Sequence, residues 1–151
     1  MSEPVTMNPP LKGSCLCGSV GISISRIRPG VDACHCDMCR RWGGGPFFSL
    51  HHVKEGEFTL SGEEHVHRYA SSDWAERASC GKCGSNLWYY LVPGKHWSFL
   101  AGLFDLPQEW QLDTQIFVDE MAPYAALAAD SPKMTGAEVI AEAKAEGYEF
   151  D

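Results

Sequence analysis

The stretch Cys80-Gly81-Lys82-Cys83-Gly84 is the part of this chain that decides its fold. Two thiols stand across a tight turn, and the glycines permit backbone angles that residues with a Cβ resist. An earlier stretch, Cys15-Leu16-Cys17-Gly18, repeats the pattern of paired thiols followed by a glycine. Zinc takes four ligands, and sulfur ligands commonly come in close pairs. The two stretches therefore favour one closed metal site that joins distant parts of the chain and whose binding energy is folding energy.

Three further cysteines, Cys34, Cys36 and Cys39, lie within six residues and supply only three sulfur ligands. Several divisions of the seven cysteines between ions agree with the spacing, and the economical division is four and three. Structural zinc is normally four-coordinate through protein groups, whereas three protein ligands plus water or substrate are typical of catalytic zinc. This division predicts two zinc ions per chain, one in a closed structural site and one in an open catalytic site.

Other interpretations of the cysteines compete with this one. Disulfides are disfavoured because the odd count leaves one thiol over and the N-terminal sequence has no secretion signal. A second structural site would need a fourth ligand, for which His51 or His52 is a better candidate than His35. The side chain of His35 should point away from the cysteines on either side of it, because neighbours in an extended segment face opposite ways. A thioredoxin-like redox pair would open a helix in a βαβ unit, and these pairs adjoin β segments.

Length, composition and charge restrict the class of protein. With 151 residues, 44% hydrophobic and 21% charged, the chain suits one globular domain. The net charge of −8 argues against nucleic acid as a partner. No apolar run is long enough to span a membrane. We therefore expect a cytoplasmic protein whose cysteines stay reduced or bind metal.

The pattern of apolar residues indicates a mainly β domain. Short β-branched or aromatic runs between turns containing glycine or proline predict strands at 19–25, 47–53, 57–60, 86–91, 97–100 and 115–118. One short helical turn is expected at 37–42.

Near the C-terminus, Thr135 and Glu138 fit a capping box, which predicts a helix over 135–146. Val139, Ile140 and Ala143 would form a narrow apolar stripe on this helix. The predicted organisation is a disordered tail over 1–12, a zinc-binding β domain over 13–129 and a helical tail over 130–151. Strand edges and the tail helix are compatible with a homodimer.

Four stretches of the chain are recognisable together: Gly13-Ser-Cys-Leu-Cys-Gly-Ser-Val20, Cys34-His-Cys-Asp-Met-Cys-Arg-Arg41, Arg77-Ala-Ser-Cys-Gly-Lys-Cys-Gly-Ser-Asn-Leu87 and Gly102-Leu-Phe-Asp-Leu-Pro107. In this order they resemble the glutathione-dependent formaldehyde-activating enzyme family, which also includes centromere protein V. The resemblance implies an all-β domain of the β-tent kind, with antiparallel sheets clamped by a four-cysteine zinc. It also implies a carbon–sulfur lyase that joins a small thiol, glutathione, to a small aldehyde, formaldehyde, as S-hydroxymethylglutathione.

The resemblance assigns the cysteines to the same two groups as the ligand count. Structural zinc would be held by Cys15, Cys17, Cys80 and Cys83, and catalytic zinc by Cys34, Cys36 and Cys39.

Three thiolates on one Zn²⁺ leave an excess negative charge that calls for cationic neighbours. Arg40 and Arg41 follow the second group directly and are candidate substrate-binding residues, together with Gly44, whose backbone can approach a ligand closely. Two alternatives remain: a non-catalytic zinc module that binds another protein, and a lyase acting on a different thiol or electrophile.

Overall fold

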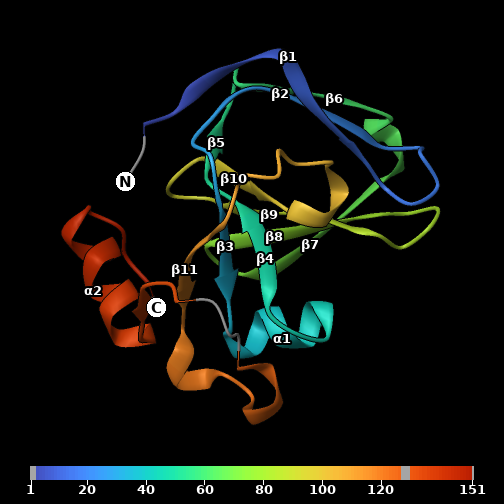
Figure 1. Cartoon of the computed structure of the whole chain (residues 1–151). Coiled ribbons are helices and arrows are strands. Elements are labelled where there is room, and N and C mark those ends of the chain that lie inside the picture. Colours follow the sequence, from blue (N-terminus) through green and yellow to red (C-terminus); the bar gives the residue numbers. More distant parts are fainter. Residues whose placement is uncertain (1–2, 127–129, 151) are drawn as a thin grey trace.

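The computed structural model of the protein describes residues 3–126 and 130–150, and its strands form three sheets (Figure 1). The first sheet has the order β1 (Val5–Ser14), β2 (Gly21–Ile27), β6 (Phe58–Ser61). The second has the order β5 (Val53–Lys54), β10 (His96–Phe99), β9 (Asn86–Leu91), β8 (Ala75–Cys80), β7 (Val66–Ser72). The third has the order β12 (Lys133–Met134), β11 (Leu112–Ile116), β3 (Val31–Cys34), β4 (Phe47–Leu50).

Helices are few in the described part of the chain. The α-helices are α1 (Asp37–Gly43) and α2 (Gly136–Ala145). Single 3₁₀ turns are η1 (Glu63–His65), η2 (Ala101–Leu103), η3 (Val118–Glu120) and η4 (Pro123–Ala125). None of the helices that the structure describes has the length and apolar character required to cross a membrane.

The predicted all-β class is confirmed, with one correction to the strand directions. The first two sheets are antiparallel. In the third sheet, β11 runs parallel to both β3 and β12. Parallel neighbours need a long connection, and the chain between β3 and β11 passes through the other two sheets before it returns. The sequence pattern does not contain this pairing, because it involves strands far apart in the chain.

Several strand boundaries differ from those predicted. The expected strand 47–53 divides at His51 and His52, so that β4 and β5 belong to different sheets. The expected strand 115–118 lies earlier, because Phe117 takes a left-handed backbone with φ of 56° directly after β11. Strand β7 was not predicted, since its exposed residues are mostly polar and lack a hydrophobic period of two.

The two ends of the chain are more closely joined to the sheets than expected. Residues 1–12 were predicted to be disordered, but β1 begins at Val5 and pairs with β2 through Val5 and Ile27. The sequence pattern did not indicate β1, because the strand is held by backbone hydrogen bonds that do not depend on apolar side chains. At the other end β12 extends the third sheet, and the Phe150 ring lies 5.4 Å from the Trp74 ring. The predicted C-terminal helix is confirmed as α2, whose first turn is capped by the Thr135 hydroxyl, 3.2 Å from the Glu138 amide.

The main core lies between the first and second sheets, which Figure 1 shows one above the other. Phe99 is its centre: this fully buried ring makes edge contacts with Phe58, Trp88 and Phe104 at centroid distances of 5.0, 5.9 and 6.4 Å. Such contacts add to the free energy of burying aromatic surface. By packing the two sheets together, this core brings the turn after β1 close to the turn after β8, and both turns carry cysteines.

Candidate metal centres

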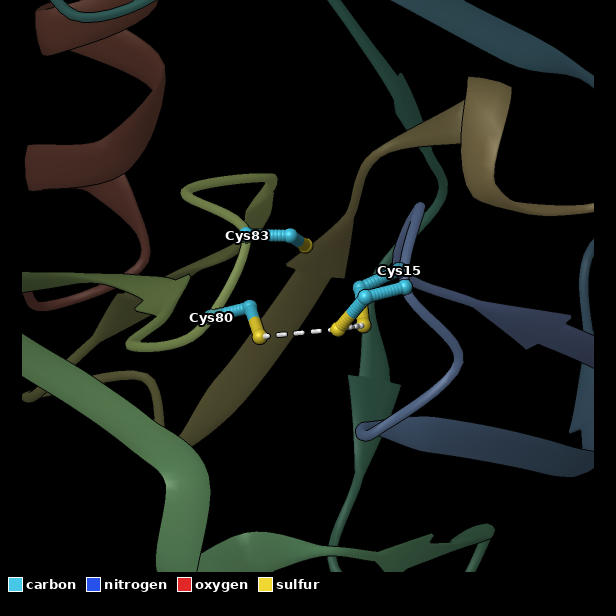
Figure 2. A group of neighbouring side chains, drawn as sticks. Cys15, Cys80 and Cys83 are labelled. Atoms are coloured by element: carbon cyan, nitrogen blue, oxygen red, sulfur yellow. Dashed lines mark hydrogen bonds between the residues drawn. The ribbon is translucent and has the colours of Figure 1, made fainter.

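The first centre consists of Cys15, Cys17, Cys80 and Cys83, whose sulfur atoms all lie within 4.8 Å of one another. Figure 2 shows Cys15, Cys80 and Cys83 converging from two separate turns. The Sγ atoms of Cys15 and Cys17 are 3.7 Å apart, and those of Cys17 and Cys80 are 3.9 Å apart. Four sulfurs arranged tetrahedrally at about 2.3 Å from one zinc would be roughly 3.8 Å from each other. The described geometry therefore fits the metal that the sequence predicts.

The two turns of this centre both contain a left-handed glycine, although they differ in length by one residue. Gly18 donates to the carbonyl of Cys15 at 3.0 Å, and Gly84 donates to the carbonyl of Cys80 at 2.8 Å. Their φ angles are 80° and 79°, a left-handed conformation that glycine adopts without strain. A Cβ at either position would meet no atom within 4 Å. It is the backbone angle, and not lack of space, that requires glycine here.

Ser85 joins the two turns and was missed in the sequence. Its hydroxyl accepts a 3.0 Å hydrogen bond from the Leu16 amide and lies 3.2 Å from the Cys83 sulfur. Hydrogen bonding by Ser85 lowers the pKa of Cys83 to about 5, which favours the thiolate that a metal needs. A serine two residues after a cysteine carries no distinctive signal, so only the folded arrangement identifies this role.

The second centre consists of Cys34, Cys36 and Cys39, and their sulfur atoms also lie within 4.8 Å of one another. Cys34 ends β3, and Cys36 is the N-cap of α1, where its sulfur accepts a 3.3 Å hydrogen bond from the Cys39 amide. Cys39 is buried in the first turn of α1. A strand followed at once by a short helix thus folds three thiols of one short segment around a common point.

These three thiols differ in their tendency to lose a proton. Hydrogen bonds from the Cys34 and Cys39 thiols lower the pKa of Cys36 to about 2, and the contact with Cys36 raises the pKa of Cys34. Negative charge is therefore concentrated on one sulfur while a neighbour keeps its proton. A coordinating metal deprotonates thiols outright, so the donor set suits a thiophilic cation such as Zn²⁺.

Arg77 is the cation that touches this second centre. Its Nη1 lies 3.5 Å from the Cys39 sulfur, and the side chain is buried. The guanidinium lies 5.0 Å from the centroid of the Trp42 ring and 5.1 Å from that of the Tyr89 ring. Arg77 precedes Cys80 by three residues on β8, so sequence proximity associates it with the first centre. The fold instead places it beside the second.

Arg40, Arg41 and Gly44 take other positions. Both arginines pair with Asp37, at 2.7 Å from Arg40 and 3.0 Å from Arg41. Gly44 is the C-cap of α1 with a φ of 84° and donates to the Arg40 carbonyl at 2.7 Å. These contacts lie within α1 and its C-cap. That Arg40, Arg41 and Gly44 bind a substrate stays a prediction.

A small pocket lies against the segment that carries the second centre. It is lined by His35, Arg40, Gly45, Pro46, Ala122, Tyr124 and Ala125. His35 and Arg40 each follow one of the three cysteines, so the pocket lies against the segment that carries them. The segment around η4 forms its far side, and Tyr124 there is 77% exposed. Only the fold brings this late segment to the cysteines.

The histidines do not complete the second centre within residues 3–126 and 130–150. His35 turns away from the sulfurs, as expected, and its Nε2 lies 3.0 Å from Gln115 Oε1. His51, a predicted candidate for the fourth ligand, instead lies 3.0 Å from Asp32 and 2.8 Å from Asp113. His52 stacks on His96, with ring centroids 3.7 Å apart. The interruption between β4 and β5 accounts for these positions, because it directs both histidines elsewhere.

Comparison with known proteins agrees with this geometry. Residues 10–120 match the family model described as glutathione-dependent formaldehyde-activating enzyme. An uncharacterized lyase of Schizosaccharomyces pombe is 33% identical over 113 residues, which cover 74% of this chain and 81% of the relative. A crystal structure of a Rhodobacter sphaeroides protein, 20% identical, covers 67% of this chain and 98% of its own with a TM-score of 0.54, and so supports the fold. The matched region contains all seven cysteines and both centres, and the chain belongs to the glutathione-dependent formaldehyde-activating enzyme family.

Proposed function

We propose that this protein is a zinc-dependent carbon–sulfur lyase that forms or cleaves the adduct of a small thiol with a small aldehyde. Glutathione and formaldehyde are the substrates that the name of the family indicates. The lyase name of the yeast relative supports the same class of reaction. The observation that carries the proposal is the second centre, where three sulfurs converge and no histidine or carboxylate of the described residues joins them.

The two centres have different roles in this proposal. Cys15, Cys17, Cys80 and Cys83 hold structural zinc, because four sulfurs complete a tetrahedron and leave no position for a substrate. Cys34, Cys36 and Cys39 hold the catalytic zinc, which would supply a Lewis-acidic position for a thiolate or an aldehyde oxygen. A reducing compartment such as the cytoplasm would keep all seven thiols available for metal.

The chain's own residues would bind and orient the substrate around that position. The pocket against the segment of the second centre has both Arg40 and Tyr124 in its lining. Arg40 can reach a substrate carboxylate only by sharing its guanidinium with Asp37, which already lies 2.7 Å from it. The exposed ring of Tyr124 can cover a bound thiol and exclude water from the reacting carbon.

Metal counting tests the division of roles. The wild-type protein is expected to bind two zinc ions, and Cys39→Ser is expected to bind one while it keeps its fold. Cys83→Ser should unfold, because the first centre joins the turns of two sheets. A wild-type protein with one zinc, or an unfolded Cys39→Ser, would contradict the open site.

The reaction is tested by exchange NMR on glutathione mixed with formaldehyde, in which adduct formation also proceeds without enzyme. The wild-type protein should accelerate exchange at the formaldehyde carbon, and Cys39→Ser should not. Equal exchange rates with both proteins, with two zinc ions bound to the wild type, would favour a non-catalytic module. Acceleration with another thiol but not with glutathione would keep the lyase and replace its substrate.

A further inference from the structure

Arg77 carries a buried positive charge for which the described residues provide no carboxylate partner. Only 5% of the residue is exposed, and its Nε has no hydrogen-bond partner in the described part of the chain. Among the described residues, its guanidinium donates a hydrogen bond to the Cys39 sulfur, at 3.5 Å. Because a buried cation without a counter-charge is strongly unfavourable, the second centre must supply the negative charge that stabilises Arg77.

Two aromatic side chains lie close to the Arg77 guanidinium. On β8 Arg77 faces Tyr89 of β9 directly in the antiparallel register. The Trp42 ring of α1 also lies close to the guanidinium, and the Asn86 side chain donates to the Trp42 carbonyl at 3.2 Å. Aromatic rings near a planar guanidinium orient it, and their attraction for the cation offsets part of the hydration that the guanidinium loses on burial. The surroundings thus direct this charge at the sulfurs.

From this arrangement we propose that Arg77 is a positioning residue of the three-cysteine centre. Its positive charge allows the centre to accept a further ligand, an anionic sulfur. The inference rests on the proposed function and specifies its substrate class, a thiol bound as thiolate. Three thiolates and one Zn²⁺ carry one excess negative charge, which would repel an incoming thiolate. The guanidinium cancels this excess, so the fourth ligand approaches a centre that is neutral as a whole.

The other arginines near the centre do not share this role. Arg40 and Arg41 are already paired with Asp37, and the side chain of Arg41 is 74% exposed. Their charges are therefore compensated locally or screened by water.

The test uses the cobalt-loaded protein, in which thiolate ligands give charge-transfer absorption. Two probes are titrated, 2-mercaptoethanol, which binds as an anion, and imidazole, which binds as a neutral ligand. Arg77→Met should weaken 2-mercaptoethanol binding about 10–100-fold, the usual effect of losing a group that contacts a metal ligand. Imidazole binding should change by less than about threefold, and Arg77→Lys, which keeps the charge, should restore most of the thiol affinity.

A matched control is Arg68→Met, since the Arg68 guanidinium also stacks on an aromatic ring, at 5.7 Å from the Trp88 centroid, but pairs with Glu63. If Arg77→Met does not fold, Arg77→Gln provides the same removal of charge with a polar side chain. Equal losses for both probes, or no loss for either, would overturn the role of Arg77 while the open site stands. A wild-type cobalt protein whose spectrum does not respond to either probe would instead overturn the open site itself.

Discussion

Replacing Gln115 with leucine removes the middle of a buried polar chain that links three distant parts of the sequence. His35 Nε2 lies 3.0 Å from Gln115 Oε1, and Gln115 Nε2 donates to Ser131 Oγ at 3.0 Å. An amide oxygen only accepts, so the imidazole Nε2 must be the donor in the first of these bonds. The exposed fractions of His35, Gln115 and Ser131 are 2%, 0% and 7%, so water cannot replace either bond.

The expected loss follows from these contacts. Gln115→Leu leaves the His35 nitrogen and the Ser131 hydroxyl without their partner, and each unsatisfied buried group costs about 1–3 kcal/mol. Leucine fills most of the volume of glutamine, so a large cavity is not created. The free energy of unfolding should fall by about 2–6 kcal/mol, which for a chain of this size corresponds to roughly 4–24 °C in Tm.

Denaturant unfolding at a fixed free zinc concentration measures this loss, because bound metal itself stabilises the folded state. Gln108→Leu is the control, since that side chain is exposed. Ser131→Ala should cost about 1–3 kcal/mol alone but add little to Gln115→Leu, because the bond is already lost. A Gln115→Leu protein within about 0.5 kcal/mol of wild type, or fully additive losses, would refute this reasoning.

Three further predictions concern the scaffold around the two centres. Gly30→Ala should lower the free energy of unfolding, measured with denaturant, by at least about 2 kcal/mol. The reason is that Gly30 has a φ of 118° and that a Cβ there would collide with the Asp113 carboxylate. An unchanged denaturant midpoint would contradict this prediction. Burial lowers the pKa of His96 in the folded protein. As pH falls below about 6.5, the His96 imidazole is therefore protonated in the unfolded chain before it is protonated in the folded protein, and the free energy of unfolding decreases. Unfolding midpoints between pH 7 and pH 5 should therefore fall more steeply for wild type than for His96→Gln, and equal slopes would exclude the effect. Thr135→Ala removes the hydroxyl that caps α2 and should destabilise this helix by about 1 kcal/mol, seen as faster amide exchange from Glu138 onward while exchange in β9 (86–91) is unchanged.

Much of the metal chemistry could be predicted because it depends on short-range order. Paired cysteines with following glycines are local patterns, and both glycines take a left-handed backbone in the structure. The count of sulfurs in each group follows from the spacing, and the fold places the groups as predicted. Strand 86–91 was predicted with its observed limits because its apolar run ends in turns at both sides. The C-terminal helix was predicted because its capping residues are adjacent in the chain.

The surroundings of the centres could not be predicted, because they combine residues from different sheets. Arg77 belongs by sequence to the segment of Cys80, yet strand alternation turns it to the other face, toward Cys39. His51 was a candidate ligand until the break between β4 and β5 placed it beside Asp32 and Asp113.

The sequence by itself therefore identified which sulfur atoms could hold metal and favoured their division into four and three, since cysteine spacing restricts where the sulfurs can meet. Only the tertiary structure decided which charge faces the open centre and which side chains support it. The reason is physical: coordination by neighbouring residues is a local property of the backbone. Charge compensation and buried hydrogen bonds depend instead on the packing of β8, β11 and α1, which no short stretch of the chain encodes.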